Sequence, residues 1–286
     1  MLFFVGLAVV FGSVLGGYLP HGNFAVLMQP FELLIIAGAA TGGFLVSNPA
    51  PVIKGVLKNF SHVIKGTPYD KQSYVELLTL LFTMLRLAKS KGPLALEEHV
   101  ENPDNSSIFK KFPTFEANHH AVTFLCDYLR MMTMGTENPY EIEALIDEEI
   151  DTHHAEQETI AQAVTTVSDG LPAFGIVAAV LGVITTMSYI LEPPEILGGM
   201  IGGALVGTFL GILLAYGVIG PIGAALHAYA DAETKYFQCI KAALIAHMQG
   251  HSPTIAIEFA RKTLFSHERP TFAELEEAVS AVPLPT

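Results

Sequence analysis

Few side chains in this sequence are grouped in a way that supports catalysis. The chain has no Walker A sequence, no GxSxG pattern and no CxxC pair, so neither a phosphate loop nor a side-chain nucleophile has support. His153 and His154 follow a carboxylate-rich helix, with Glu149 four residues before His153. Such residues can bind a metal, but their spacing matches no strong ligand motif, and a solvated acidic helix face explains them better. We therefore expect no enzyme activity, no metal site and no cofactor.

Ion transport is the other chemistry open to an apolar chain, and it usually needs an ionisable side chain within the membrane. The stretch 169–191, DGLPAFGIVAAVLGVITTMSYIL, begins with Asp169 and then has no ionisable group besides the phenol of Tyr189. The polar side chains deep in the runs 172–191 and 197–226 are hydroxyls, among them Thr185, Thr186, Ser188 and Thr208, while Glu32 lies near the start of the run 31–46. If this chain takes part in ion flow, a partner must therefore supply the group that carries the ion.

Two prolines interrupt these apolar runs. Pro172 lies where a helix would begin, three residues after Asp169, and the first turn of a helix tolerates a missing N–H group. Pro221 follows Gly220 inside an apolar run, so it is expected to kink or end its helix. The first proline is thus explained by a helix start alone, and the second is not.

Small residues recur every four positions along the last apolar run, at Gly199, Gly203, Gly207 and Gly211, followed by Ala215. A stripe of this kind lets a neighbouring helix approach closely in a membrane. The preceding run offers Gly175, Ala179 and Gly182 to face it. Helix packing by itself explains the stripe as well as a functional role does.

The elements that must position these residues are membrane helices. The chain has 286 residues, of which 51% are hydrophobic and only 15% charged, and its mean hydropathy is +0.44. This is too apolar for an ordinary soluble domain. A helix needs about 20 apolar residues to cross a bilayer core, and four stretches qualify, at 1–19, 31–46, 172–191 and 197–226. The first lacks the basic region of a signal peptide, so we expect it to be retained.

Charge predicts the orientation of these spans. All 15 Lys and Arg residues fall between Lys54 and Arg130 or between Lys235 and Arg269, and the two short loops between spans have none. Basic residues stay on the cytoplasmic side, so both termini and both basic blocks are predicted to be cytoplasmic.

The net charge of −13 argues against nucleic acid as a partner. Cys126 and Cys239 are expected to be buried, reduced thiols.

The predicted fold is an all-α integral membrane protein. Transmembrane helices 1 and 2 occupy residues 1–50, a large cytoplasmic helical insertion 51–170, transmembrane helices 3 and 4 171–226, and a cytoplasmic helical tail 227–286. Within the insertion we expect one helix over 74–86 that ends near Gly92, one over 118–134 and one from Tyr140. This last helix should bury the stripe Ile142, Leu145, Ile146 and Ile150. In the tail, Thr271 and Glu274 should form a capping box.

Longer motifs give the sequence a family resemblance. It resembles the MotA family of flagellar stator proteins, which belongs with the TolQ and ExbB proton channels. The motifs run from the first span to the tail, and the order of two spans, an insertion, two spans and a tail agrees with them. They are GGYLPHGNFAVLMQPFELLIIAGAA, the ENP of 101–103, EIEALIDEEIDTH, DGLPAFGIVAAVLGV, VGTFLGILLAYGVIGP and EFARKTLFSHERPTFAELEE.

The resemblance implies a stator subunit in the bacterial inner membrane. Five copies surround a dimer of MotB, which supplies the peptidoglycan anchor and the aspartate that carries the ion, and ion flow drives torque on the rotor protein FliG. Pro172 and Pro221 match the family's functional prolines, and Asp169 matches the acid before the first of them. Ala179 and Thr208 match positions that line the ion path. Alanine at 179, where sodium-driven relatives commonly have threonine, favours H⁺ over Na⁺.

The same resemblance assigns a rotor-facing surface. Glu97 matches the family's rotor-facing acid, and eight residues earlier this chain has Lys89 where the family usually has arginine. Lysine keeps the charge but loses the fork geometry, so Lys89, Lys91 and Arg86 remain alternatives for the basic contact. An ordinary solvated surface is a further reading of these residues.

Two points stay open at the level of sequence. Asp169 either takes part in ion exit or only caps a helix. The function also has two alternatives. One is an ExbB- or TolQ-like energiser of outer-membrane processes, which would have one span ahead of the insertion, whereas this sequence has two. The other is a membrane scaffold without ion flux.

Overall fold

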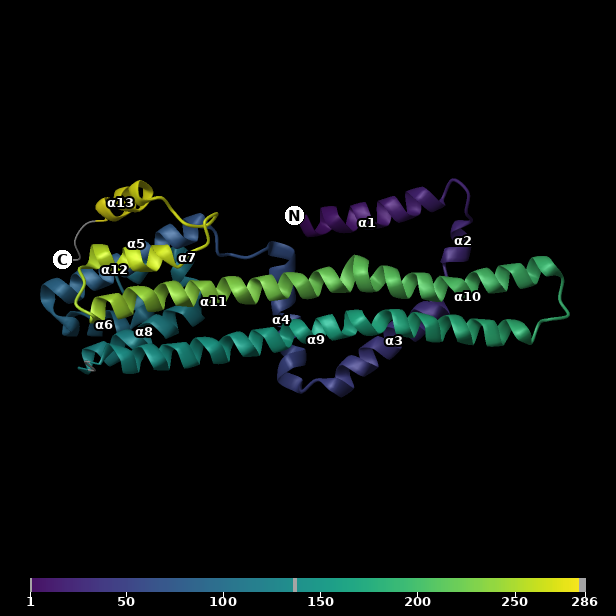
Figure 1. The fold of residues 1–286 in the computed structure, drawn as a ribbon, viewed down its shortest axis with the longest axis horizontal. Coiled ribbons are helices and arrows are strands. Elements are labelled where there is room, and N and C mark those ends of the chain that lie inside the picture. The colour runs from purple at the N-terminus through teal and green to yellow at the C-terminus, as the bar shows by residue number, and fades with distance from the viewer. Residues whose placement is uncertain (1, 136–137, 283–286) are drawn as a thin grey trace. The chain divides into compact units, whose positions relative to one another are not determined.

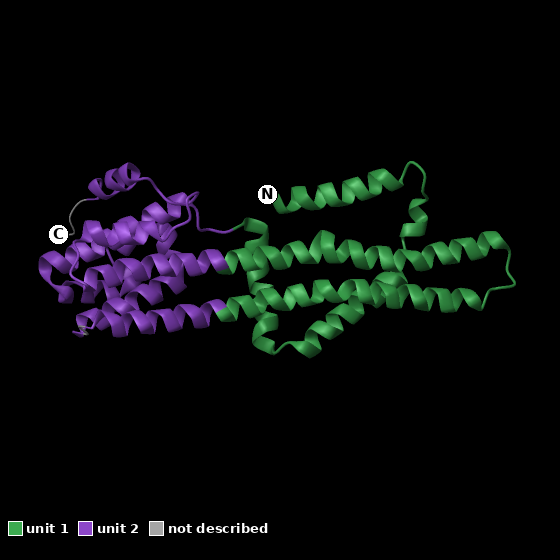
Figure 2. Ribbon diagram, viewed as in Figure 1, with its two compact units in different colours: residues 1–66, 155–230 green, residues 67–154, 231–286 purple. Residues whose placement is uncertain are grey.

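All regular structure in the described part of the chain is helical. The computed structural model describes residues 2–135 and 138–282, and no strand occurs among them (Figure 1). This confirms the predicted all-α fold. The chain forms two compact units, unit 1 from Met1–Gly66 and Ala155–Ala230 and unit 2 from Thr67–His154 and Asp231–Thr286 (Figure 2). Each domain limit expected from composition falls inside a helix, because the same helix continues from the apolar segment into the polar one.

Unit 1 contains the apolar helices. Its elements are α1 (Leu2–Tyr18), α2 (Phe24–Leu27), α3 (Pro30–Ser47), α4 (Ala50–Lys65), residues 155–187 of α9 (Pro139–Met187), α10 (Pro194–Leu214), a π-helical turn (Ala215–Ile219) and residues 220–230 of α11 (Gly220–Met248). Among the described residues, three helical stretches are long and apolar enough to cross a membrane, and they lie within Phe24–Ser47, Pro139–Met187 and Pro194–Met248. The uncharged α1 has 17 residues, somewhat fewer than the three others, and is consistent with a fourth span.

The tightest packing in unit 1 joins α9 to α10. A Cβ atom on Gly211 would lie 2.7 Å from the carbonyl oxygen of Leu171 and 2.9 Å from the Cα of Gly175. A Cβ atom on Gly175 would lie 2.8 Å from the carbonyl oxygen of Gly207. The two backbones therefore touch directly, as the predicted glycine stripe requires.

The stripe does not act as one surface, however. Gly203 faces the side chain of Gln29, which would lie 2.8 Å from an added Cβ, and Gly182 of α9 faces Ala204. Among the described residues, nothing lies within 4 Å of a Cβ on Gly199. Of the four glycines of the stripe, Gly207 and Gly211 are thus the two whose Cβ positions lie against the described α9 backbone.

Helix α4 was not expected as a separate element, and it is amphipathic. Its Val63 packs in a cluster with Ala161, Val164, Ile222 and Leu226. The Nδ2 of Asn59 donates to Oε1 of Gln157 at 2.7 Å. On the other side of α4, Leu57 is 74% exposed. The helix is thus held against α9 and α11 within unit 1 by one face only.

Unit 2 is built around a buried helix. Its α-helices are α5 (Lys71–Lys91), α6 (Glu97–Glu101), α7 (Pro113–Glu116), α8 (His119–Thr133), α12 (Pro253–Lys262) and α13 (Phe272–Ser280), with residues 139–154 of α9 and 231–248 of α11 and the short 3₁₀ turns Pro93–Leu96, Pro103–Asn105 and Phe109–Lys111. Leu77, Leu81 and Leu85 of α5 are fully buried. The helix begins with a capping box between Asp70 and Ser73 and ends at Gly92, whose φ of +87° favours glycine.

Most sequence predictions for unit 2 are confirmed. Helix α8 begins after Asn118, whose side chain accepts from the N–H of Ala121, and both cysteines are buried free thiols. Burial raises the pKa of the Cys126 thiol to about 12. The predicted stripe on α9 is wrong at one position, because Leu145 is 47% exposed while Ile142, Ile146 and Ile150 are buried.

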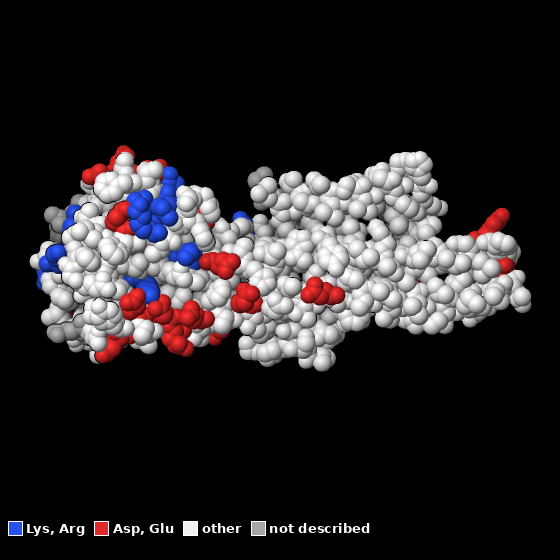
Figure 3. All heavy atoms as spheres, in the orientation of Figure 1, with Lys and Arg blue, Asp and Glu red and all other residues white. Residues whose placement is uncertain are grey.

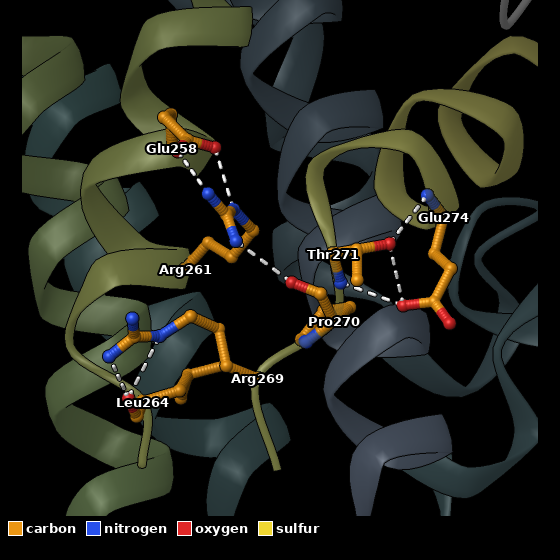
Figure 4. Close-up of polar contacts among 7 residues, drawn as sticks. All are labelled: Glu258, Arg261, Leu264, Arg269, Pro270, Thr271 and Glu274. Atoms are coloured by element: carbon orange, nitrogen blue, oxygen red, sulfur yellow. Dashed lines mark hydrogen bonds and ion pairs between the residues drawn. The ribbon is translucent and has the colours of Figure 1, made fainter. Parts of the chain in front are cut away.

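The tail motif EFARKTLFSHERPTFAELEE folds back on itself (Figure 4). Arg261 donates through Nε to Oε2 of Glu258 at 2.7 Å and through Nη1 to the carbonyl oxygen of Pro270 at 2.9 Å. The next residue, Thr271, forms the predicted capping box with Glu274 at the start of α13. Glu274 also accepts from Nζ of Lys71 at 2.7 Å, and the hydrogen bonds from Lys71 and then from Thr271 lower the pKa of Glu274 to about 2. The motif therefore fixes α13 beside α5.

The glycine contact gives a direct test of the packing in unit 1. We expect Gly211→Val to lower the melting temperature of the purified chain in detergent, because its side chain would meet the α9 backbone, and overpacking costs about 1–3 kcal/mol. Gly199→Val is the matched control, since its Cβ would meet open space. Equal melting temperatures for the two variants, measured by circular dichroism, would contradict the arrangement of α9 and α10.

Candidate functional site

Pro172 lies inside α9 and not in its first turn. The prediction that it starts a helix is therefore wrong. The helix continues through it because the residues before it, including the buried Ser168 and Leu171, are held by packing in unit 1. Since proline has no N–H group, the carbonyl of Ser168, four residues earlier, loses its helical hydrogen bond. Asp169 is exposed within the same helix and cannot cap a helix start, so that reading of Asp169 is also wrong.

Pro221 lies in the first turn of α11, directly after the π-helical turn Ala215–Ile219. In that turn the N–H of Gly220 donates to the carbonyl oxygen of Ala215, five residues earlier. The helix that starts as α10 is thus widened just before the proline and continues through it as α11. Single π turns inside α-helices are frequent at functional sites.

The helix segments that precede the two prolines are joined by a side chain that the sequence did not single out. The hydroxyl of Ser168 donates to the carbonyl oxygen of Ala215 at 2.8 Å, and both residues are buried. A Cβ on Gly220 would lie 2.9 Å from that oxygen and 3.1 Å from Oγ of Ser168. The Ala215 carbonyl therefore accepts two hydrogen bonds, one from each helix. A hydroxyl four residues before a proline in an apolar run was the signal that could have identified Ser168.

Ala179 and Thr208 flank the glycine contact on facing helices. The backbone nitrogen of Ala179 lies 3.0 Å from the Cβ position of Gly207, and the Cα of Thr208 lies 3.3 Å from that of Gly175. Both residues are half-buried. Neither 170–191 nor 197–226 contains an Asp, Glu, Lys, Arg or His residue. The structure thus brings Ala179, Thr208 and the two prolines onto one pair of helices whose walls have no fixed charge.

Four charged residues were expected to form a second site, on unit 2, where the charged side chains gather (Figure 3). Lys89 and Lys91 at the end of α5 and Glu97 at the start of α6 are exposed. Arg86 is half-buried, with its guanidinium 5.1 Å from the ring centre of Phe82 and its Nη2 donating to the carbonyl oxygen of Val282 at 3.3 Å. Arg86 is thus engaged by the tail, whereas the two lysines and Glu97 face solvent.

The residues considered for a metal site in the sequence do not converge. Nε2 of His153 lies 2.9 Å from Oε2 of Glu233, while Nδ1 of His154 lies 2.9 Å from Oγ1 of Thr234. The carboxylate of Glu149 accepts a hydrogen bond from Tyr128 instead. Adjacent positions on a helix point about 100° apart, which separates these side chains.

The hydrogen bond between α9 and the π turn can be tested by removing one hydroxyl. We expect Ser168→Ala to lower the stability of unit 1 by about 1 kcal/mol and to speed hydrogen exchange at the backbone amides of 216–220. Thr166→Ala is the matched control, because the exposed Thr166 hydroxyl donates to the carbonyl of Gln162 in its own helix turn. Unchanged exchange in the Ser168 variant, followed by mass spectrometry, would argue against the link.

Comparison with known proteins agrees with this geometry. Residues 4–92 match the family described as motility protein A N-terminal, and residues 116–239 match the MotA/TolQ/ExbB proton channel family. The chain is 46% identical to motility protein A of Escherichia coli (strain K12), over 100% of this chain and 97% of that protein. It is 34% identical to chemotaxis protein LafT of Vibrio parahaemolyticus serotype O3:K6, over 96% of both chains.

Two solved structures have the same fold. The structure of C. jejuni MotAB matches with a TM-score of 0.79 at 21% identity, over 94% of this chain and 98% of that chain. The flagellar MotAB stator complex from Bacillus subtilis matches with a TM-score of 0.75 at 23% identity, over 96% and 98%. With the full-length identity to motility protein A and the apolar, proline-linked helices described above, these likenesses show that the chain belongs to the MotA family of membrane-spanning motility proteins, which are ion-channel proteins and not enzymes.

Proposed function

We propose that this chain is a stator subunit of the bacterial flagellar motor, which forms a proton channel with MotB and converts proton flow into torque on FliG. The observation that carries the proposal is the uncharged wall around Ala179 and Thr208, on the same helices as the two segments that precede the prolines and share the Ala215 carbonyl. The names of the relatives and the titles of the similar structures support it.

The mechanism follows from what the wall lacks. A fixed carboxylate on α9 or α10 would bind a proton and hold it, whereas a wall of small and apolar residues lets a carboxylate on another chain release its proton after passing. MotB supplies that aspartate. Moving one elementary charge through 100 mV releases about 2.3 kcal/mol, so a small number of protons provides the work for each step against a loaded rotor.

The proline-containing turns convert this event into movement. Pro172 and Pro221 each remove one helical hydrogen bond, so the helices have fewer bonds to break where they bend. When the π turn changes its conformation, the hydrogen bonds that Gly220 and Ser168 donate to the Ala215 carbonyl break and re-form. Because both helices donate to this carbonyl, α9 and α11 move together. Asp169, exposed one residue beyond Ser168, lies near this turn, where the proton leaves toward the cytoplasm.

The exposed apolar surface of unit 1 supports an assembly. Ile176, Val180 and Ile184 of α9 are each more than half exposed in the single chain, and in the membrane such residues face lipid, a neighbouring copy or MotB. Five copies around two MotB chains cover them. The inner membrane is the site of this complex, with unit 2 and both termini in the cytoplasm, because the Lys and Arg residues fall between Lys54 and Arg130 or between Lys235 and Arg269.

The rotor contact is made by Lys89, Lys91 and Glu97. These three side chains are exposed around the turn at Gly92, whereas Arg86 is held over Phe82 and by the tail. FliG presents complementary charges to them. An ExbB- or TolQ-like energiser is disfavoured, because α1 and α3 both precede the part of the chain that forms unit 2.

The identity of the ion gives the first test of this function. We expect swimming speed in cells that depend on this chain to fall to zero when an uncoupler collapses the proton gradient, and to stay constant when Na⁺ is replaced by K⁺. The reason is that Ala179 offers no hydroxyl ligand for a desolvated Na⁺ ion, which prefers oxygen. A speed that follows external Na⁺ and ignores the uncoupler would overturn the choice of proton.

Charge reversal tests the rotor contact. Glu97→Lys should reduce, without abolishing, swimming speed, because exposed ion pairs contribute about 0.2–1 kcal/mol each, and reversal of a basic residue on FliG should restore part of it. Glu98→Lys is the matched control, since Glu98 is the exposed neighbour on the same helix. If no reversal on FliG rescues Glu97→Lys, or if both variants behave alike, direct contact at Glu97 is excluded.

A further inference from the structure

Three metal-binding side chains from separate helices of unit 2 meet at one point. His120 lies in the first turn of α8, His153 on α9 and Glu233 on α11, and their ligand atoms all lie within 4.8 Å of one another. The residues are far apart in sequence, so no spacing motif indicates them. They also belong to unit 2 and are separate from the uncharged wall of α9 and α10.

The distances in this group suit a small metal ion. Two ligand atoms on a tetrahedral zinc ion, with bonds of about 2.0–2.1 Å, lie about 3.3 Å apart. Nε2 of His153 lies 2.9 Å from Oε2 of Glu233, and the ring centres of His120 and His153 are 4.3 Å apart at an angle of 53°. Around one ion the His153–Glu233 pair would open by about 0.4 Å, and a pair near the 4.8 Å limit would close by about 1.5 Å, which side-chain rotation can supply.

Neighbouring residues orient the ligands in the way known metal sites do. The other carboxylate oxygen of Glu233 accepts from the hydroxyl of Tyr69 at 3.3 Å, and that hydroxyl accepts from Nδ2 of Asn118 at 3.3 Å. Glu233 itself is only 6% exposed. Carboxylates that bind a metal ion are usually held by hydrogen bonds in this way.

The surroundings also provide a wall and an entrance. The ring of Phe237 packs edge-on against both imidazoles, with ring centres 4.9 Å from His120 and 5.6 Å from His153. His120 is exposed and His153 half-buried. A metal ion can therefore reach the group from solvent on the His120 side, while the Phe237 side excludes water.

We propose that His120, His153 and Glu233 bind one Zn²⁺ ion per chain, with water in the fourth position. Two imidazoles and one carboxylate are a ligand set that zinc accepts, whereas Mg²⁺ and Ca²⁺ require mainly oxygen ligands. The ion connects the start of α8 to α9 and α11 within unit 2 and stabilises that arrangement. The sequence predicted no metal site, because only His153 of the three lies in the segment that was considered.

Zinc binding by the whole chain tests this site. The chain is purified in detergent with a tag that lacks histidine, stripped with a chelator and titrated with Zn²⁺ against a fluorescent zinc chelator of known affinity. We expect about one Zn²⁺ ion per chain, a higher melting temperature with zinc, and the spectrum of tetrahedral Co²⁺ when cobalt replaces zinc. His120→Ala and Glu233→Gln should each bind Zn²⁺ at least about 10-fold more weakly.

The histidines next to the two proposed histidine ligands provide matched controls. His154→Gln and His119→Ala change neighbours of the proposed ligands, and His154 contacts Thr234 instead. Both should bind zinc as the unmodified chain does. His120 is exposed, so its alanine variant keeps the fold and decides the matter if Glu233→Gln unfolds. The proposal is overturned if the unmodified chain binds no zinc against the competitor, or if His120→Ala binds as well as the unmodified chain or no more weakly than the two controls.

Discussion

Unit 1 depends on the direct approach of two helix backbones at Gly175, Gly207 and Gly211. In a membrane, lipid is as apolar as the side chains, so helices gain little from burying apolar surface and associate through close packing and hydrogen bonds. The glycines provide that packing, with Cβ positions that would lie 2.7–3.2 Å from carbonyl oxygens of the facing helix. Because this contact uses only small residues, the larger apolar side chains of α9 remain outside it and are available to other partners.

The same constraint explains the turns that contain the prolines. Within a bilayer core a backbone polar group without a partner is costly, and Pro172 and Pro221 each remove a donor. In the helix segments next to these positions, the Ala215 carbonyl accepts from the Gly220 N–H through the π turn and from the Ser168 hydroxyl. The disturbed parts of α9 and of the α10–α11 helix are thereby placed opposite each other. A movement in one must change the hydrogen bonding of the other, which is what a device that couples ion passage to helix movement needs.

Unit 2 follows the physics of a soluble domain. Its α5 is fully buried along one side by apolar packing, and the tail closes over it through the contacts of Arg261, Thr271 and Glu274. This closure engages Arg86 and leaves Lys89, Lys91 and Glu97 exposed. The choice of solvent-facing charges is therefore a result of how the tail packs. A zinc ion at His120, His153 and Glu233 would brace other helices of the same unit.

Local chemistry in the sequence determined the helices, their caps and their apolar character. The Gly92 end of α5, the Asn118 cap of α8 and the Thr271 box of α13 were all predictable, because a cap depends on residues within one turn of it. The glycine spacing likewise indicated a close helix contact. The family resemblance identified Pro172, Ala179, Thr208 and Pro221 as candidates. The sequence alone did not predict how these residues are arranged in space.

Only the tertiary structure decided which of these residues meet. Pro172 lies inside a helix because packing on both sides of it outweighs the one hydrogen bond that it removes. Ser168 gained a role because Ala215, 47 positions away, lies opposite it. His153 lies with His120 and Glu233 and not with its neighbour His154. Adjacent side chains on a helix point in different directions, whereas the packing of α8, α9 and α11 brings residues of different helices together. Sequence determines elements through short-range chemistry, whereas sites are made by contacts between residues that only the folded chain brings together.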